Sequence, residues 1–233
     1  MFIDPTGMSK EDIEIGRNEV ANRKLNSNEI KTVLSALQNI TDDKLTFNKK
    51  NNRIEIKEFG KGDKKEGTEL IRKLINNQNT VTININIDGK YGMVGATSGA
   101  TNGDVENTTN GRGTDISISL GFGHEIYTMD SKGKVSVEKL STTDMLTHEL
   151  VHTIAQVNGE TSPGFNNNTP VYYTDVNGNA QIEMIPKEEY LTIFGERISK
   201  KDKGYQYPTE NRLRREQKKN KRINYLKTKQ IKR

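Results

Sequence analysis

The chain has 233 residues, no cysteine, no tryptophan and a net charge of +5, and 31% of its residues are hydrophobic. This length suits one domain with tails, or two small domains, and the low apolar content allows one modest core. Without cysteine there are no disulfides, thiolate metal ligands or cysteine nucleophiles. No apolar run approaches the roughly 18 residues of a membrane span. The first residues do not have the pattern of a secretory signal, so we expect no signal peptide.

The charge is concentrated at the C-terminal end. Residues 211–233 carry a net charge of +10, which leaves −5 for the rest of the chain. Such a stretch can bind nucleic acid, acidic protein or anionic lipid, or it can be a solvated end. Tyr225 is its only aromatic residue. Stacking platforms are therefore missing and specific nucleic-acid recognition is not expected. We treat 216–233 as a basic C-terminal tail.

Hydrophobic periodicity and turn residues predict both helices and strands along the chain. The segment of 26 residues at 88–113 is rich in Gly, Asn and Thr, and it is predicted to be a long loop. In chain order the predictions are helical spacing over 9–40 with Asn28 as a cap, a strand at 53–59, a helix at 67–77, strands at 80–87, 115–120 and 134–138, a helix at 142–157 capped by Thr142 or Thr143, a hairpin around Asn177-Gly178, and a short helix at 187–197.

The most informative motif is His148-Glu149-Leu150-Val151-His152, in the predicted helix at 142–157. Histidines four residues apart lie on one helix face, where their imidazoles can take two adjacent positions of a tetrahedral zinc site. Glu149 follows the first histidine directly. In this motif the carboxylate reaches water at the metal and can act as general base. The strand at 115–120 is expected to run beside the site and to pair with an extended substrate.

A zinc site of this kind needs a third protein ligand. The side chains of the sequence that could serve as this third ligand are Glu188, Glu189, His124, Asp175 and Glu183. The run Glu-Glu-Tyr-Leu-Thr-Ile-Phe-Gly at 188–195 resembles the second zinc helix of thermolysin-like peptidases, with Glu, a bracing Asp four later and Gly three after that. The resemblance implies that Glu188 is the ligand, with Glu189 less favoured. It also implies that Thr192 lies beside a ligand histidine, which its hydroxyl would hold in position more weakly than the Asp of those peptidases.

Further residues are candidates for supporting roles. His124 follows the strand at 115–120 and could be a fourth group or an oxyanion donor. Arg214 could hold an oxyanion, bridge to Glu188 or Glu189, or form a salt-bridged helix start capped by Thr209. Oxyanion donors are also offered by three tyrosines, Tyr207, Tyr172 and Tyr173.

Three segments together resemble the NleD-type family of effector metallopeptidases. They are HELVHTIAQVNG, EEYLTIFG and the closing run YPTENRLRRE at 207–216, which contains Thr209, Glu210, Asn211 and Arg214. The family commonly has alanine where this chain has Thr153, a departure that does not touch the ligands. The resemblance implies a zinc endopeptidase delivered as a toxin or effector. Its protein substrate would lie in a target cell, bacterial or eukaryotic.

The opening FIDPTGM at 2–8 resembles the junction that ends the core of Rhs-type repeat proteins. It implies that 1–8 is a junction remnant and that the chain is delivered or secreted as part of a larger toxin, in which case a cognate immunity protein is expected. Residues 9–215 are then a zincin-like domain of the gluzincin type, with an α+β fold and a mixed, mainly antiparallel sheet packed on the HExxH helix. The alternatives are a non-catalytic module that binds polyanions through the basic tail, and a zinc hydrolase of a non-peptide bond.

Overall fold

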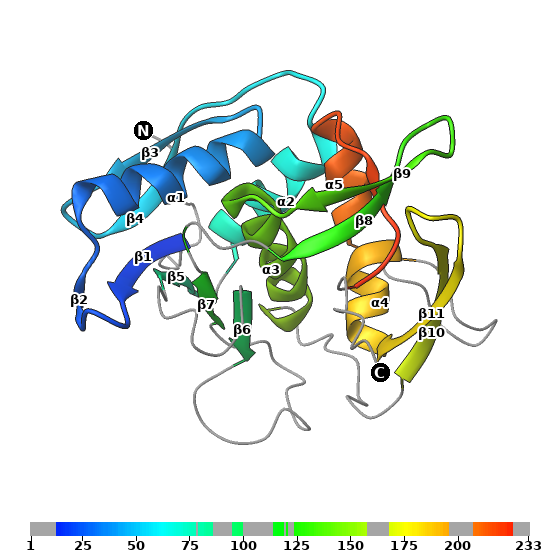
Figure 1. Cartoon of the computed structure of the whole chain (residues 1–233). Coiled ribbons are helices and arrows are strands. Elements are labelled where there is room, and N and C mark those ends of the chain that lie inside the picture. The colour runs from blue at the N-terminus through cyan, green and yellow to red at the C-terminus, as the bar shows by residue number, and fades with distance from the viewer. Residues whose placement is uncertain are drawn as a thin grey trace.

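The architecture is that of a computed structural model, which describes residues 13–77, 79–85, 114–118, 120, 124–157, 168–195 and 207–225, and the backbone of 95–99. The resemblance at residues 2–8 lies outside this part. Figure 1 shows a sheet on one side of α3 (Thr142–Val157), and α4 (Lys187–Phe194) with two hairpins on the other. The fold is α+β with a mixed sheet, as the sequence predicts. No helix in the described ranges is long and apolar enough to cross a membrane.

The large sheet has the strand order β3-β4-β1-β5-β7-β6, with the short β2 added beside β1. β1, β5 and β7 are parallel, and the other pairs are antiparallel. The strand bounds are β1 (Ile13–Asn18), β2 (Arg23–Lys24), β3 (Lys44–Asn48), β4 (Arg53–Glu58), β5 (Val81–Ile85), β6 (Gly95–Gly99) and β7 (Thr114–Ile118).

Smaller elements complete the other side of the molecule. A three-stranded sheet has β8 in the middle, and β10 pairs with β11 as a separate hairpin. The bounds are α1 (Ser27–Ile40), α2 (Lys65–Ile75), β8 (Glu125–Met129), β9 (Val135–Lys139), β10 (Asn168–Thr174), β11 (Ala180–Pro186), α5 (Glu210–Glu216) and β12 (Lys221–Arg222).

The hydrophobic core lies between the large sheet and the first three helices. β5 contributes Val81, Ile83 and Ile85, the alternating positions that predict this strand, and all three are fully buried. Leu146 and Leu150 of α3 belong to the same cluster. Nearly every side chain of α3 is buried, as expected for a helix that has neighbours on all sides. This burial keeps water away from the backbone that carries the histidines.

The N-terminus of α3 is fixed by polar contacts. Ser141, rather than Thr142 or Thr143, is its cap: the Ser141 hydroxyl accepts from the N–H of Asp144 at 3.2 Å, and the Asp144 carboxylate accepts from the N–H of Ser141 at 2.9 Å. Arg214, which is 1% exposed, donates to Asp144 at 2.9 Å and to Glu138 at 2.5 Å. Arg214 therefore joins α5 to the start of α3 and to β9.

Several local predictions are wrong. Residues 13–18 form a strand instead of a helix, because Ile13 and Ile15 alternate into the core of the sheet. The cap of α1 is Asn26 and not Asn28. β6 lies within the predicted loop at 88–113, and the strands β3 and β8 were not predicted. β7 is an interior strand between β5 and β6, so it has no free edge for a substrate.

α4 ends at Phe194, three residues before the end of the predicted helix at 187–197. Gly195 has a φ of +67°, a left-handed conformation that favours glycine, and its N–H donates to the carbonyl of Leu191 at 2.8 Å. A Cβ on Gly195 would lie only 2.3 Å from Cγ2 of Thr209, the residue that caps α5. Glycine thus lets the end of α4 approach the start of α5, which brings the carboxylates of both helices toward α3.

The start of α1 provides a test by pH. Glu29 accepts from the N–H of Asn26 at 2.7 Å and from Arg23 at 2.8 Å, and its hydrogen bond with Arg23 lowers the pKa of Glu29 to about 2. A lowered folded-state pKa stabilises the protein above the unfolded-state pKa, and this contribution is lost as the pH falls toward 2. We expect Glu29→Gln to lower the free energy of unfolding by about 1 kcal/mol at pH 7. In urea titrations the difference from wild type should shrink between pH 4.5 and 2; a constant difference would contradict this role.

Candidate metal centre

Two imidazoles of α3 point at one spot. The helix places His148 and His152 one turn apart, and their Nε2 atoms lie 3.1 Å from each other. Their ring planes are inclined by 77° with centroids 4.7 Å apart. Both side chains are largely buried. The predicted arrangement of the two histidines on one helix face is therefore present.

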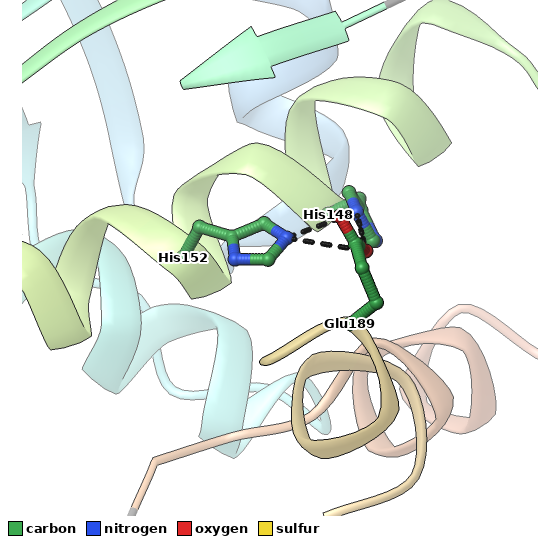
Figure 2. A group of neighbouring side chains, drawn as sticks. All are labelled: His148, His152 and Glu189. Atoms are coloured by element: carbon green, nitrogen blue, oxygen red, sulfur yellow. Dashed lines mark hydrogen bonds and ion pairs between the residues drawn. The ribbon is translucent and has the colours of Figure 1, made fainter. Parts of the chain in front are cut away.

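The third member of the group comes from α4, which packs against α3. Oε2 of Glu189 lies 3.0 Å from Nε2 of His148 and 3.4 Å from Nε2 of His152. Figure 2 shows the Glu189 carboxylate reaching up from α4 to both rings. One potential ligand atom from each of the three residues lies within 4.8 Å of the others. The sequence favours Glu188 over Glu189 here, but the structure places Glu189 at the centre of the group.

Each histidine has a carboxylate on its other ring nitrogen. Nδ1 of His148 lies 2.9 Å from Oε2 of Glu210, at the start of α5. Nδ1 of His152 lies 3.0 Å from Oε1 of Glu188 and 3.3 Å from Oγ1 of Thr192. A carboxylate can only accept, so Nδ1 carries the hydrogen in both rings and the lone pair of each neutral imidazole is on Nε2. Metal-binding histidines usually have such partners.

The electrostatics of the group balance buried charges of both signs. Burial opposes protonation of His148, but the negative charge of Glu189 outweighs it and raises the pKa of His148 to about 9. Burial alone would raise the pKa of Glu189, yet the two histidines hold it well below its usual range. In the same way Arg222 overcomes the effect of burial and lowers the pKa of Glu210 to about 2. The centre therefore attracts positive charge strongly.

The residues present fit a zinc ion. Two imidazole nitrogens and one carboxylate oxygen are a known donor set for catalytic zinc, with a fourth position left for water. Oε2 of Glu189 is buried beside the two Nε2 atoms, which cannot donate to it when the imidazoles are neutral with the hydrogen on Nδ1; this arrangement costs free energy unless a cation accompanies it. His148, His152 and Glu189 are therefore the residues that would hold the metal.

Two more side chains lie at this centre. Glu149 is buried, and its charge acts on both His152 and Tyr225. The hydroxyl of Tyr225 hydrogen-bonds to Glu189; burial and the charge of Glu189 together raise the pKa of Tyr225, which keeps the phenol protonated. The sequence indicates three other tyrosines as donors, and Tyr225 is not among them. The role of Tyr225 cannot be predicted from its position in a basic stretch, because neither periodicity nor a motif links this residue to α3.

Tyr225 is positioned by a segment that sequence analysis treats as part of a solvated tail. Arg222 is buried and binds Glu210, and its backbone exchanges hydrogen bonds of 2.7 and 2.9 Å with the side chain of Asn211. Asn224 is fully buried and accepts from the N–H of Tyr127 at 2.7 Å. As far as residue 225, this segment is part of the fold and of the candidate site.

Other predicted residues lie elsewhere. Arg214 is bound to Glu138 and Asp144, and so matches the salt-bridged helix start rather than an oxyanion or ligand contact. Tyr207 belongs to the hydrophobic core. His124 precedes β8, where its carbonyl accepts from the N–H of Leu140 at 2.9 Å. The remaining candidates have backbone partners: Asp175 accepts from its own turn and Glu183 from the N–H of Tyr225.

No protein-family model matches the chain, and no curated protein matches it. Two solved structures show distant structural similarity. One is the light chain protease of botulinum neurotoxin serotype C1, with a TM-score of 0.34 and 22% identity over 50% of this chain and 28% of that one. The other is the type C light chain with zinc removed, with a TM-score of 0.35 and 17% identity over 81% and 38%. The chain thus spans well under half the length of either.

The buried pair of Arg222 and Glu210 gives a test of how the centre is supported. Arg222→Leu leaves the fully buried Glu210 without its arginine, and we expect unfolding free energy to fall by about 3–5 kcal/mol. Arg215→Leu is the matched control, because the Arg215 side chain is 74% exposed and should change stability by no more than about 0.5 kcal/mol. Urea denaturation at neutral pH measures both. Similar effects of the two substitutions would contradict the proposed support.

Proposed function

We propose that the protein is a zinc-dependent endopeptidase that hydrolyses peptide bonds of a protein substrate. One observation carries this proposal. Both histidines of the HExxH helix have their Nδ1 atoms held by carboxylates, and both Nε2 atoms lie beside the buried Oε2 of Glu189. This arrangement would be costly without a bound cation, and it supplies three ligands of the kinds that catalytic zinc uses. We assign Glu189 as the third ligand and Glu188 as the residue that orients His152.

A zinc ion bound here would supply Lewis-acid chemistry, polarising a peptide carbonyl and acidifying water. Glu149 is the residue that takes the proton from that water and then passes it to the leaving amine. Its place directly after His148 puts it on α3 beside the centre, and its charge acts on Tyr225.

Tyr225 is the donor we assign to the developing oxyanion. Its raised pKa keeps the hydroxyl protonated at neutral pH, so it can donate a hydrogen bond throughout the reaction. Arg222 holds the backbone beside it, through donation to the carbonyl of Tyr225 and at 2.9 Å to that of Asn224. Arg222 is thus a positioning residue, as it acts on the reaction through Tyr225 and Glu210.

For its biological setting, we propose a toxin or effector that acts on a protein of a target cell. The support is the resemblance of three segments to NleD-type effector peptidases and of residues 2–8 to an Rhs-type junction. Delivery as part of a larger toxin, and a cognate immunity protein in the producing cell, belong to the same proposal. A polyanion-binding tail is less well supported, since Arg222 within it is engaged in a buried ion pair.

Substitution of Glu149 tests the catalytic assignment. Glu149→Gln keeps the side-chain shape but removes the base, so we expect zinc content to stay at one per chain while hydrolysis falls by roughly a thousandfold. The measurement is zinc by mass spectrometry together with the mapping of new protein termini after incubation with bacterial and eukaryotic proteomes. Glu69→Gln, on the exposed side of α2, is the control and should behave as wild type.

The outcomes separate the alternatives. Full proteolytic activity in the Glu149→Gln variant would exclude the proposed base. Stoichiometric zinc in the wild type without any new termini would favour hydrolysis of a non-peptide bond. Absence of zinc, combined with affinity for polyanions that collapses with salt, would favour the non-catalytic module.

A further inference from the structure

A second concave surface lies beside α4. It is a groove of about 560 Å³, a size typical of sites that enclose a bulky side chain or small ligand. Its apolar walls come from both hairpins, from α4 and from the strand β12 with its following residue, and they include Met129, Val135, Tyr172, Tyr190, Phe194 and Ile223. In Figure 1 the β8–β9 hairpin runs above α4 and the β10–β11 hairpin lies to its right. None of these residues has a role in the chemistry assigned above.

Two residues that line the groove lie close in the chain to residues of the metal centre. Tyr190 directly follows the ligand Glu189 on α4, and its ring lies against that of Phe194 with centroids 5.1 Å apart. Ile223, which lines the groove, lies two residues before Tyr225, whose hydroxyl hydrogen-bonds to Glu189. A chain bound at the centre can thus extend into the groove past Tyr190 or Ile223.

Exposed hydrophobic side chains are concentrated on the β10–β11 hairpin, whose strand β10 forms one wall of this groove. Among the described residues six large hydrophobic side chains are exposed, and four of them lie on the β10–β11 hairpin, namely Tyr172, Val176, Ile182 and Met184. Tyr172 is 76% exposed and pairs across the hairpin with Ile182, and Pro170 pairs with Met184, so these side chains share one face. An apolar face next to a hollow of this kind marks an interaction site.

The backbone of the hairpin suits an extended partner. Five consecutive residues of β10, from Pro170 to Thr174, line the groove. β10 pairs with β11 on one side, and no other described strand joins this two-stranded sheet. An extended polypeptide can add itself to such an edge through backbone hydrogen bonds while alternate side chains enter a pocket. Lys221 also lines the groove, and Lys132 and Lys134 are exposed in the turn around Gly133.

We propose that this groove binds the substrate polypeptide: an extended segment lies along β10, a large aliphatic or aromatic side chain fills the hollow, and neighbouring acidic residues meet the three lysines. The inference rests on the proposed function, because the proposed peptidase centre next to the groove is what makes the bound chain a substrate. It identifies the substrate class as an unfolded or extended segment with an apolar residue in an acidic context. It also makes Tyr172 and Val135 specificity-determining residues that do not touch the reacting atoms.

The test uses the full-length chain with Glu149→Gln, which binds without cleaving. The probe is fluorescein-labelled, reduced and carboxymethylated α-lactalbumin, an acidic and permanently unfolded polypeptide, and binding is followed by fluorescence anisotropy. Tyr172→Ser and Val135→Asp are introduced separately, and Phe59→Ser, an aromatic residue 63% exposed beside Arg72 of α2, is the matched control. Circular dichroism and zinc content verify that each variant folds. Because Tyr172 is exposed, its replacement should disturb folding less than the replacement of Val135.

We expect tenfold or greater weakening of binding in each groove variant and no change in the Phe59→Ser control. The same substitutions in the active protein should raise KM for cleavage of the probe with kcat little changed. Equal binding by the groove variants and the parent would overturn the inference. Groove-dependent binding without cleavage of the probe or of any proteome protein by the wild type would instead contradict the proposed hydrolysis and leave the polypeptide-binding surface standing.

Discussion

The hydrogen bonds on Nδ1 of His148 and His152 are the constraint on which the rest of the site depends. Because Glu210 and Glu188 can only accept, they fix the proton on Nδ1 and leave both Nε2 lone pairs directed at the same point. With neutral imidazoles, the adjacent Glu189 would be a buried carboxylate lacking a positive partner. The protein thus builds a site whose charge is balanced only when a cation or a proton is bound.

This constraint explains much of the surrounding fold. Glu210 can be fully buried only because Arg222 pairs with it, and Arg222 is held by Asn211 and by the carbonyls that follow it. The segment after α5 must therefore fold against α3 and α4. The same segment brings the Tyr225 hydroxyl to the centre, where it hydrogen-bonds to Glu189. One set of buried polar contacts consequently connects stability, histidine orientation and the placement of a donor, so changes in this segment should affect all three together.

The sequence predicts what local periodicity and motif spacing determine. The helix at 142–157, the alternation of Val81, Ile83 and Ile85, and the hairpin at Asn177-Gly178 are all confirmed. It does not predict contacts that depend on tertiary packing. Glu188 and Glu189 are adjacent in a first helical turn, and only the angle at which α4 meets α3 decides which reaches Nε2. The role of the segment that holds Arg222 is hidden for the same reason, since a cluster of basic residues has the same composition whether it is solvated or buried.

The position of a bound zinc ion is the most direct test of this account. Anomalous diffraction at the zinc edge, from crystals of the full chain grown with one equivalent of zinc, locates the metal independently of activity. The account predicts one strong peak about 2.0–2.1 Å from Nε2 of both histidines and about 2.0–2.2 Å from a carboxylate oxygen of Glu189, with Glu188 and Glu210 still on the Nδ1 atoms. A peak coordinated by Glu188 or through Nδ1, or no peak at this centre, would contradict it.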